Sequence, residues 1–398
     1  MKITQLNIEG FRSLKHVTWK PGDLNVIIGP NGSGKSNLLR MLELISASAE
    51  GRLSKHILAA GGMGSLVWDG EASDINWTVA CLGRPIPSYR LIYRVNLMRT
   101  GLSSSYEVRE EAVDHYHLDF EQESASSVKH LLQRLGSNAF ILDDSDKQNR
   151  LRIEESELGE TTLSLMSTPL AGNTHLRFVR LDLAAWSVYH DIRVDRDAAI
   201  RQPAISRLEN RVSPDGQNLI NVLHTLYTGD REFKRQVNSA MSAAFGDDFD
   251  ELIFPPASDQ RVQLRVRWKT LKREQSAADL SDGTLRFLFL LAVLASPNPA
   301  PLIAIDEPET GLHPSMLPLV AELAVDAAER TQVVFTTHSD QFLDAFRETG
   351  VRPTTTVARW ENGETTLTTL DDEDLAYWLK DYTLGNLFRS GELESMAS

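Results

Sequence analysis

A glycine-rich loop near the N-terminus has the spacing of a phosphate-binding site. The stretch "VIIGPNGSGKSNLL", residues 26–39, fits G-x-x-x-x-G-K-[ST] from Gly29 to Ser36, between an apolar run and a helical pattern. Glycine lets the backbone wrap closely, so consecutive N–H groups point at phosphate oxygens, and the positive end of the following helix adds to the attraction. We expect Lys35 to reach the β- and γ-phosphates and Ser36 to bind Mg²⁺. The pattern therefore predicts a site for a nucleoside triphosphate.

Two acidic residues follow a second apolar run late in the chain. In "LIAIDEPE", residues 302–309, four apolar residues lead into Asp306 and Glu307, which predicts a buried strand with both acids at its carboxyl end. Ligands of open α/β sheets bind at that end of the strands. We expect Asp306 to hold Mg²⁺, directly or through water, and Glu307 to orient and deprotonate an attacking water. Beside the glycine-rich loop, this pair predicts hydrolysis of the triphosphate.

Two further segments carry groups suited to a γ-phosphate. "LSDGTLRFL", residues 280–288, begins a helix with Ser281 at the cap position and Gly283 two residues later, so its free N–H groups form a second anion site. One nucleotide cannot easily occupy both sites of one chain, which favours a site facing the γ-phosphate held by a partner chain. "TTHS" ends another apolar run with His338, where a γ-phosphate sensor could stand. Taken alone, Ser281 would be a plain helix cap and His338 a structural histidine.

The elements that must position these residues can be predicted from apolar periodicity. Apolar runs predict buried strands before Gly29, before Asp306 and up to His338, and a helical period predicts a helix after Lys35. The stretch "LRFLFLLAVLAS", residues 285–296, indicates a buried helix. Further predicted elements are a helix in "LDLAAWSVYH" (181–190), a period-two strand in "RVQLRVRWKT" (261–270), and a hairpin that turns at Asn362-Gly363, a pair suited to a type I′ turn.

Length and composition indicate a globular, soluble, cytoplasmic protein. The 398 residues can bury a real core, and 41% of them are hydrophobic and 24% charged. The net charge of −14 argues against a diffuse attraction to nucleic acid, although it leaves a local basic patch open. Cys81 is the only cysteine, which excludes an internal disulfide and any CxxC zinc site. No apolar run reaches the length of a membrane span, so no membrane partner is expected.

Together these motifs resemble the ABC-type ATPase heads of the RecF, SMC and OLD group. "EGFRSL", "IIGPNGSGKSNLL", "LSDGTLRFL", "AIDEPETGLHP" and "TTHS" occur in the order of that group. The resemblance implies an ATPase that uses ATP and Mg²⁺, with Glu307, His338 and Lys35 as catalytic residues. It places the metal between Ser36 and Asp306. "SPDGQNLINVL" and "YTLGNLFRSGEL" look more specifically like stand-alone bacterial AAA family ATPases of this group.

The same resemblance implies which residues contact the nucleotide. Arg12 of "GFRS" matches a position that lies near the phosphates in several such heads, and Glu309 to His313 fall in the D-loop, which crosses the dimer interface. The implied contacts are Arg12, the Walker A residues Gly29, Pro30, Asn31, Gly32, Ser33, Gly34, Lys35, Ser36 and Asn37, and the signature residues Ser281, Asp282 and Gly283.

The sequence departs from several members of that group. The signature is S-D-G-T where transporters have S-G-G-Q, which argues against a transporter subunit. The residues between the loop and the signature lack the long heptads of SMC arms, so no coiled-coil lever is expected. The stretch after His338 is too short for the Toprim nuclease of OLD enzymes. A Q-loop glutamine cannot be assigned between Gln202 and Gln217.

The expected fold is an α/β P-loop NTPase of the ABC head type. We expect a mixed core sheet, an antiparallel β subdomain and an inserted helical lobe. Residues 1–370 should form one head, with the first lobe at about 1–120 and 298–370 and the inserted lobe, carrying the signature, at about 121–297. Residues 371–398 form a C-terminal tail, which either packs on the head or docks a partner protein.

The expected partner is a second copy, bound head to tail around ATP. Three uses of such a dimer are open: a DNA repair or anti-phage ATPase, a regulator of a nuclease or toxin partner, and, least favoured, a transporter motor. The strand at 261–270 bears on DNA, because its basic face could follow phosphates or could be a solvated face that pairs with acids. Those basic residues are Arg261, Arg265, Arg267 and Lys269, with Arg193, Arg196, Arg201 and Arg207 as further candidates.

Overall fold

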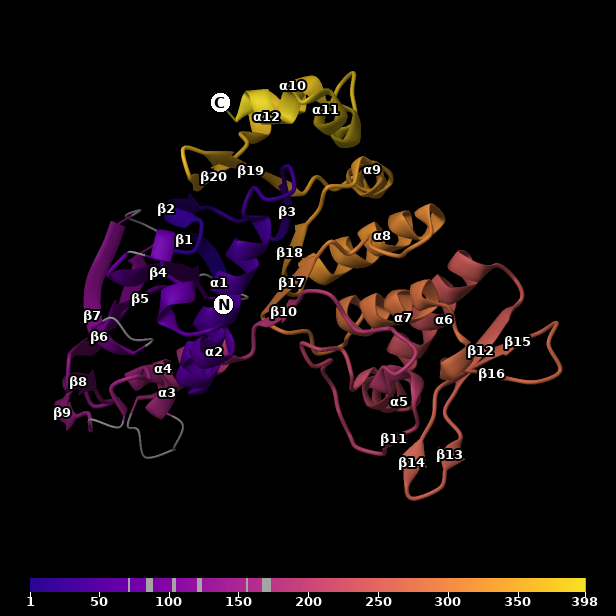
Figure 1. Cartoon of the computed structure of the whole chain (residues 1–398), viewed down its shortest axis with the longest axis horizontal. Helices are drawn as coiled ribbons and strands as arrows, with labels where there is room; N and C mark the ends of the chain where they lie inside the picture. Colours follow the sequence, from indigo (N-terminus) through magenta and orange to yellow (C-terminus); the bar gives the residue numbers. More distant parts are fainter. Residues whose placement is uncertain are drawn as a thin grey trace.

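The computed structural model describes residues 1–70, 72–83, 89–101, 105–119, 124–154, 157–166 and 173–397. In Figure 1 the chain forms two limbs that diverge downward from a central sheet, with the C-terminal helices above it. The N-terminal half makes up the limb on the left, and most of residues 190–295 make up the limb on the right.

The central sheet has six strands in the order β10-β17-β18-β3-β19-β20. Strands β10, β17, β18, β3 and β19 are parallel to one another, and the edge strand β20 pairs antiparallel with β19. This arrangement confirms the expected mixed sheet. The strands are β10 (Ser187–Tyr189), β17 (Leu302–Asp306), β18 (Gln332–Thr336), β3 (Leu24–Ile28), β19 (Thr354–Glu361) and β20 (Glu364–Thr369).

Both faces of the central sheet are covered, so its middle strands are apolar without interruption. In β17, Ile303 and Ile305 point into one hydrophobic core, and Leu302 and Ala304 point into the other. Successive side chains of a strand face opposite sides, so a run of four apolar residues is what a doubly covered strand requires. This arrangement leaves the carboxyl ends of the strands, rather than their faces, open for a ligand.

The limb on the left is an antiparallel sheet with helices packed against it. Its eight strands have the order β2-β1-β4-β5-β6-β7-β8-β9. The same core contains residues of the helices α1, α3 and α4. The strands are β1 (Lys2–Phe11), β2 (Leu14–Trp19), β4 (Asp74–Leu82), β5 (Tyr89–Arg99), β6 (Tyr106–Asp119), β7 (Ser124–Leu135), β8 (Asn138–Leu142) and β9 (Gln148–Arg152); the helices are α1 (Lys35–Glu50), α2 (Leu53–Ala59), α3 (Thr162–Leu165) and α4 (Thr174–Ala184).

The path of the chain bears on where the inserted lobe begins. The expected boundary near 121 lies outside the described residues, but β7, β8 and β9 follow it and extend the sheet begun by β1. Strand β10 then joins the central sheet beside β17. We therefore propose that the inserted lobe begins near residue 190, since the chain up to that point is built into the first lobe.

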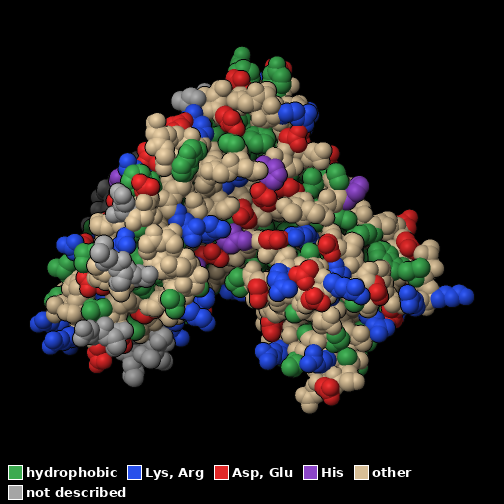
Figure 2. Space-filling view, viewed as in Figure 1, with side chains coloured by type: hydrophobic (Ala, Val, Ile, Leu, Met, Phe, Trp, Pro, Cys, Tyr) green, Lys and Arg blue, Asp and Glu red, His purple; other side chains and the backbone are tan. Residues whose placement is uncertain are grey.

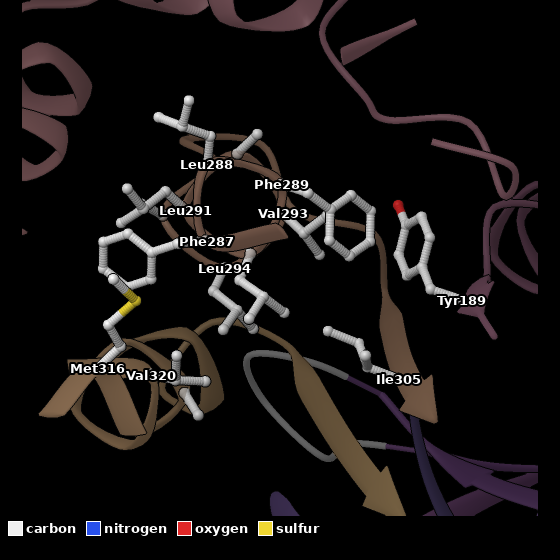
Figure 3. Packing of buried hydrophobic residues seen from close by; sticks show 14 of the residues in the cluster. Tyr189, Phe287, Leu288, Phe289, Leu291, Val293, Leu294, Ile305, Met316 and Val320 are labelled. Atoms are coloured by element: carbon white, nitrogen blue, oxygen red, sulfur yellow. The ribbon is translucent and has the colours of Figure 1, made fainter. Parts of the chain in front are cut away.

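The limb on the right surrounds a buried helix, α7 (Asp282–Leu294). Around α7 lie α5 (Leu219–Gly229), α6 (Arg231–Phe245) and two small sheets. The first has the order β11 (Ala204–Ile205), β14 (Arg261–Val262) and β13 (Pro256–Ala257), and the second has the order β12 (Phe249–Ile253), β15 (Arg265–Trp268) and β16 (Gln275–Ser276). Figure 3 shows side chains of α7 packed between Tyr189 of β10, Ile305 of β17, and the residues Met316 of η7 (Pro314–Met316) and Val320 of α8 (Leu317–Ala328). The rings of Tyr189 and Phe289 lie 5.1 Å apart edge to face. Helix α7 is therefore fixed to the two strands that end beside it.

Two sequence predictions are wrong in this region. The stretch 181–190 is not one helix, because α4 ends at Ala184 and the chain then forms β10. The period-two stretch 261–270 is not one strand. Its first part forms β14 (Arg261–Val262), and its second forms β15 (Arg265–Trp268) in the other small sheet. Val262, Leu264 and Val266 are all buried, so the alternation is kept although the chain changes partners.

The C-terminal residues pack on the head. Helices α8 (Leu317–Ala328) and α9 (Asp340–Thr349) cover the central sheet, and α10 (Asp372–Trp378), α11 (Leu384–Ser390) and α12 (Glu392–Met396) follow β20. Asp340 of α9 accepts a 2.6 Å hydrogen bond from Arg389 Nε, and Leu387 and Leu393 are buried in the core. Of the two alternatives for the tail, packing on the head is what the structure describes. Among the described residues, no helix is both long enough and apolar enough to cross a membrane.

Candidate functional site

The candidate site lies along one edge of the central sheet. Strands β3, β17, β18 and β10 run parallel, so the segments that leave their carboxyl ends meet at that edge. These segments carry the loop 29–36, the acids Asp306 and Glu307, His338, and a histidine that sequence reasoning missed, His190. Figure 2 shows histidine and acidic side chains gathered in the middle of the face, above the hollow between the two limbs.

The backbone of the loop 29–36 is shaped by glycines and held from the C-terminal hairpin. Gly34 has φ +96°, and a Cβ on it would lie 2.0 Å from Thr365 Oγ1, so no side chain fits there. Thr365 Oγ1 donates to the Ser33 carbonyl oxygen at 2.9 Å. Asn37 Nδ2 donates to Ser13 Oγ at 2.8 Å, which directs this side chain toward the turn after β1. The loop is therefore preformed in its wrapped shape.

Lys35 lies folded beneath this loop. It is only 6% exposed, and its Nζ donates to the carbonyl oxygens of Gly29 at 2.7 Å and Pro30 at 3.1 Å. Burial lowers the pKa of Lys35, although the charges of Glu307, Asp306 and Glu309 act in the opposite direction. The ammonium group is thus held in a low-dielectric position where a phosphate would be a stronger partner than two carbonyl groups.

The residues around the loop fit a triphosphate. Asn31 and Gly32 are exposed, and nothing lies within 4 Å of a Cβ placed on Gly32, so the crest of the loop is open. Ser33 Oγ is buried without a hydrogen-bond partner. Helix α1 begins at Lys35, directly behind the loop, and directs its positive end there. Exposed amides, one buried cation and a helix N-terminus form the donor set that phosphate oxygens require.

Asp306 connects three of the segments at this edge. Its Oδ1 accepts hydrogen bonds from Ser36 Oγ at 3.4 Å and from Thr336 Oγ1, and its Oδ2 lies 3.3 Å from His190 Nδ1. Burial alone would raise the pKa of Asp306, but the hydrogen bonds from His190, Thr336 and Ser36 outweigh burial and lower it. Asp306 is therefore a carboxylate at neutral pH, and with Ser36 it supplies the hard oxygen ligands that Mg²⁺ prefers.

Glu307 and His338 form a second pair beside Asp306. Glu307 has φ +48°, a strained value for a residue with a side chain, and its N–H donates to the Thr336 carbonyl oxygen at 3.0 Å. His338 Nδ1 lies 3.0 Å from Glu307 Oε1, and both side chains are partly exposed. The turn therefore directs a carboxylate oriented by a histidine toward solvent, as a general base for a bound water requires.

His190 is the main residue that sequence reasoning did not find. Its Nδ1 faces Asp306 and its Nε2 lies 3.1 Å from Glu43 Oε2 on α1. Neither Gln202 nor Gln217, the two considered for a Q-loop, makes a hydrogen bond to Asp306 in the described part of the chain. The sequence signal for His190 was weak, because this histidine follows a strand of three residues, Ser187–Tyr189, which is too short to show a period.

The environment of His190 has a consequence for stability that can be measured. Burial lowers the pKa of His190, but the hydrogen bonds to Asp306 and Glu43 raise the pKa by more than burial lowers it. The pKa of His190 therefore rises from the ordinary value of 6.5 to about 9. A folded-state pKa above the unfolded value stabilises the protein fully below about pH 6.5, and the stabilisation is lost as the pH rises through about 9. This stabilisation should be on the order of 2 kcal/mol, a value that is reduced because the ring is partly exposed to solvent.

We therefore expect His190→Gln to lower the melting temperature most at pH 6.5, and the difference from wild type to shrink by pH 10. Thermal unfolding in metal-free, nucleotide-free buffer measures both proteins across this range. His16→Gln is the matched control, since His16 is an exposed histidine of β2 near only one acid, Glu9. A difference for His190→Gln that stays constant with pH would contradict the assignment of charge to this ring.

Comparison with known proteins assigns the chain to a family. A family model described as "AAA domain, putative AbiEii toxin, Type IV TA system", AAA_21, matches residues 24–344 and so covers most of the chain, from β3 to α9. The chain belongs to the AAA_21 family. No curated protein matches it in sequence.

Solved structures show the same fold for this AAA_21 member. A structure of the SMC head bound to the C-terminal winged-helix domain of ScpA superposes with a TM-score of 0.57 at 14% identity, covering 95% of this chain and 100% of that one. An SMC head with an extended coiled coil, bound to the C-terminal domain of ScpA and derived from Pyrococcus furiosus, gives 0.55 at 15% identity over 96% and 99%. One from Pyrococcus yayanosii gives 0.51 at 12% identity over the same shares. The AAA_21 chain therefore has the fold of an SMC-head ATPase domain.

Arg12 lies near Glu43 of α1, whose carboxylate also contacts His190. It sits in the turn after β1 with φ +48°, and its N–H donates to the Leu66 carbonyl oxygen at 2.7 Å. Burial and the nearby Arg40 lower its pKa, and Glu43 acts in the opposite direction. Arg12 therefore lies near α1, and Glu43 of that helix also contacts His190. Among the described residues, the buried Arg12 Nε has no hydrogen-bond partner and is available to a ligand.

The signature residues of this AAA_21 member lie apart from its own loop 29–36. In the described structure, no hydrogen bond or ion pair joins Ser281, Asp282 or Gly283 to that loop. Ser281 is exposed and caps α7 by accepting the Thr284 N–H at 3.1 Å. A Cβ on Gly283 would lie 2.7 Å from the Gly311 carbonyl oxygen, so this glycine is required for packing on the segment predicted to be the D-loop of the same chain. The cap itself faces solvent and is accessible to another molecule.

The basic side chains considered for DNA mostly have partners within the protein. Arg267 pairs with Glu251 at 2.8 Å and Glu274 at 3.0 Å, and Arg265 lies 3.7 Å from Glu274. Lys269 Nζ donates to the Asp247 carbonyl oxygen at 2.6 Å. Arg201 is buried. The alternative of an acid-paired surface is therefore better supported at 261–270 than a face that follows phosphates.

Proposed function

We propose that this AAA_21 chain binds ATP with Mg²⁺, hydrolyses it, and dimerises head to tail around two ATP molecules. The observation that carries the proposal is the convergence of Lys35, Ser36, Asp306, Glu307 and His338 at one sheet edge, while the exposed cap of α7 lies in the other lobe. Each ATP would be held between the loop 29–36 of one copy and Ser281–Gly283 of the other.

The loop and its neighbours would hold the substrate. The amides of residues 29–36 and the ammonium group of Lys35 would bind the β- and γ-phosphates, since Lys35 needs only to exchange two carbonyl partners for phosphate oxygens. Ser36 and Asp306 would hold Mg²⁺, which draws negative charge from the β- and γ-phosphates. Arg12 would offer its spare donor to the phosphates from the side of α1.

Glu307 would act as the general base. Its carboxylate accepts a proton from water as the water oxygen attacks the γ-phosphorus, and the bond from that phosphorus to the bridging oxygen breaks to leave ADP and phosphate. His338 holds one carboxylate oxygen at 3.0 Å, so it fixes the direction of the other. The strained turn at Glu307 supports this role, since such backbone conformations persist where a side chain must be aimed.

A dimer explains why the two phosphate-binding segments lie in different lobes. Helix α7 begins after the cap residue Ser281, and the first backbone N–H groups of such a helix N-terminus would form an anion site. Among the described residues, no hydrogen bond or ion pair joins this N-terminus to the loop 29–36. Two copies related by a twofold axis would bring each α7 N-terminus to the loop of the other copy, and so would form two equal sites.

For the biological role, two uses stay open as proposals. The family description names a toxin–antitoxin system, which favours an ATPase whose closed or open state controls a toxic partner protein. The alternative is a DNA repair or anti-phage ATPase, which the acid-paired arginines at 261–270 make less favourable. SMC heads in the compared structures bind a domain of ScpA, and by analogy the head of this chain offers surfaces for a partner.

A mixing experiment tests the shared site. We expect Ser281→Arg, which blocks the cap of α7, and Glu307→Gln, which lacks the base, each to have almost no ATPase activity alone. In a mixed dimer, the intact loop and Glu307 of the first variant meet the intact Ser281 of the second. Equal amounts should recover about a quarter of the wild-type rate, since half of randomly formed pairs carry one competent site of two. Phosphate release measures the rates, and a mixture as inactive as its components contradicts the shared site.

A further inference from the structure

A buried arginine lies directly beneath the signature turn. Arg201 is 8% exposed, and its guanidinium group donates to four carbonyl oxygens and one carboxylate. Nε donates to the Val194 carbonyl oxygen at 2.8 Å, and Nη1 donates to those of Leu280 at 2.7 Å, Ala277 at 3.2 Å and Ala278 at 3.3 Å. Nη2 donates to Asp282 Oδ1. Arg201 has no role in the proposed hydrolysis of ATP itself.

The carbonyl contacts fix how the chain enters α7. Ala277 and Ala278 belong to the short helix η6 (Ala277–Asp279), and the Ala277 carbonyl oxygen also accepts the Leu280 N–H at 3.4 Å. Arg201 gathers these carbonyl groups and that of Leu280 on one planar fork of donors. Leu280 immediately precedes Ser281, so the guanidinium group sets the direction in which the cap residue leaves the turn. A lysine, with one point charge, could not hold this geometry.

The contact of Arg201 with Asp282 reduces an electrostatic repulsion. Asp282 is the second residue of a turn that, under the proposed function, faces the triphosphate of a partner chain. An unpaired carboxylate there would repel that anion. The Arg201 guanidinium group holds the Asp282 carboxylate and compensates its charge, while Ser281 and Asp282 remain exposed residues.

We propose that Arg201 is a positioning residue for the signature turn: it orients Ser281–Gly283 through the carbonyl contacts and neutralises Asp282, so that the turn accepts the triphosphate of a second copy. This inference rests on the proposed function. It also reassigns Asp282 from a direct nucleotide contact to an anchor of the turn. Arg201 itself is buried and touches no substrate.

A double-mutant cycle in the Glu307→Gln parent tests the inference. Arg201→Gln is expected to weaken ATP-dependent dimerisation by at least about tenfold, while fluorescent ATP still binds the monomer as in the parent. Asp282→Asn leaves the charge of Arg201 unopposed near the triphosphate and is expected to tighten the dimer severalfold. The double variant should recover part of the loss, since the unpaired carboxylate is gone. A residue with only a structural role would show no such recovery.

The matched control is Arg193→Gln, because Arg193 lies on the same segment but is exposed and pairs with Asp195 at 3.1 Å. Sedimentation velocity gives the dimer constants, and circular dichroism verifies folding. An Arg201→Gln protein that dimerises like its parent, or a double variant no better than the single one, overturns the inference. If Arg201→Gln does not fold, the dimer constant of Asp282→Asn in the same parent is the deciding measurement. A weaker dimer than that of the parent then overturns the inference.

The outcomes for this inference and for the proposed function are distinct. A Glu307→Gln parent that stays monomeric with ATP and Mg²⁺ overturns the proposed function and this inference with it. A parent that dimerises, together with Arg201 and Asp282 variants that behave as the parent does, overturns this inference alone.

Discussion

Lys35→Ala is expected to lose ATP binding. The Lys35 ammonium group is the one cation buried beneath the loop 29–36 in the described structure, and a hydrogen bond from a charged donor to phosphate is among the strong ones in proteins. We expect the affinity to fall at least about a hundredfold, or ~3 kcal/mol, with ATPase activity lost in proportion. Fluorescent nucleotide binding and phosphate release measure the two effects.

The substitution should leave the fold intact, which makes the result interpretable. Among the described residues, the hydrogen-bond partners of Lys35 Nζ are the carbonyl oxygens of Gly29 and Pro30, and its burial is a cost that alanine removes. Lys20→Ala is the matched control, since Lys20 is an exposed lysine just after β2. Binding by Lys35→Ala within tenfold of wild type would exclude the loop 29–36 as the main phosphate site.

Glu307→Gln is expected to slow hydrolysis by about 10²–10⁴-fold, because the base that takes the proton from water is lost. Glutamine has the same shape and can keep the hydrogen bond to His338, so binding of ATP should be unchanged. ATP bound without hydrolysis should then hold two copies together. Phosphate release gives the rate, and light scattering with saturating ATP and Mg²⁺ should show a dimer.

Glu309→Gln provides the comparison for that experiment. Glu309 also follows β17, but its Oε1 accepts a 2.6 Å hydrogen bond from Thr337, and burial raises its pKa. One oxygen of this carboxyl group is bonded within the protein, so Glu309→Gln should slow hydrolysis less than about tenfold. Equal losses in the two variants would show that Glu307 has no special role. A Glu307→Gln protein that stays monomeric with saturating nucleotide would refute the dimer mechanism.

Local patterns in the sequence predicted the parts of the fold that short-range chemistry decides. Asn362 and Gly363 both have positive φ, as a type I′ turn needs, and they join β19 to β20. The apolar runs before Asp306 and up to Thr336 are strands, since a sheet covered on both faces selects apolar residues at every position. In such cases the residues that specify the structure are neighbours in the chain.

The errors arose where a distant partner decided the local structure. Ser187–Tyr189 extends the helical pattern of α4 in sequence, yet it forms a strand because β17 offers it a free edge in the central sheet. The stretch 261–270 alternates as a strand should, yet it divides at Gln263 because its two parts pair with different small sheets. The propensities of single residues and the period of apolar residues carry no information about which distant strands will pair.

Spacing within a few residues is enough to predict the loop at Gly29–Ser36, the acids at Asp306 and Glu307, and the order of the motifs. The positions of His190 against Asp306 and of Arg201 beneath Ser281 follow from the folded chain instead. They could not be predicted because a contact between residues far apart in the chain leaves no periodic signal. It is specified by the packing of whole strands and helices against one another.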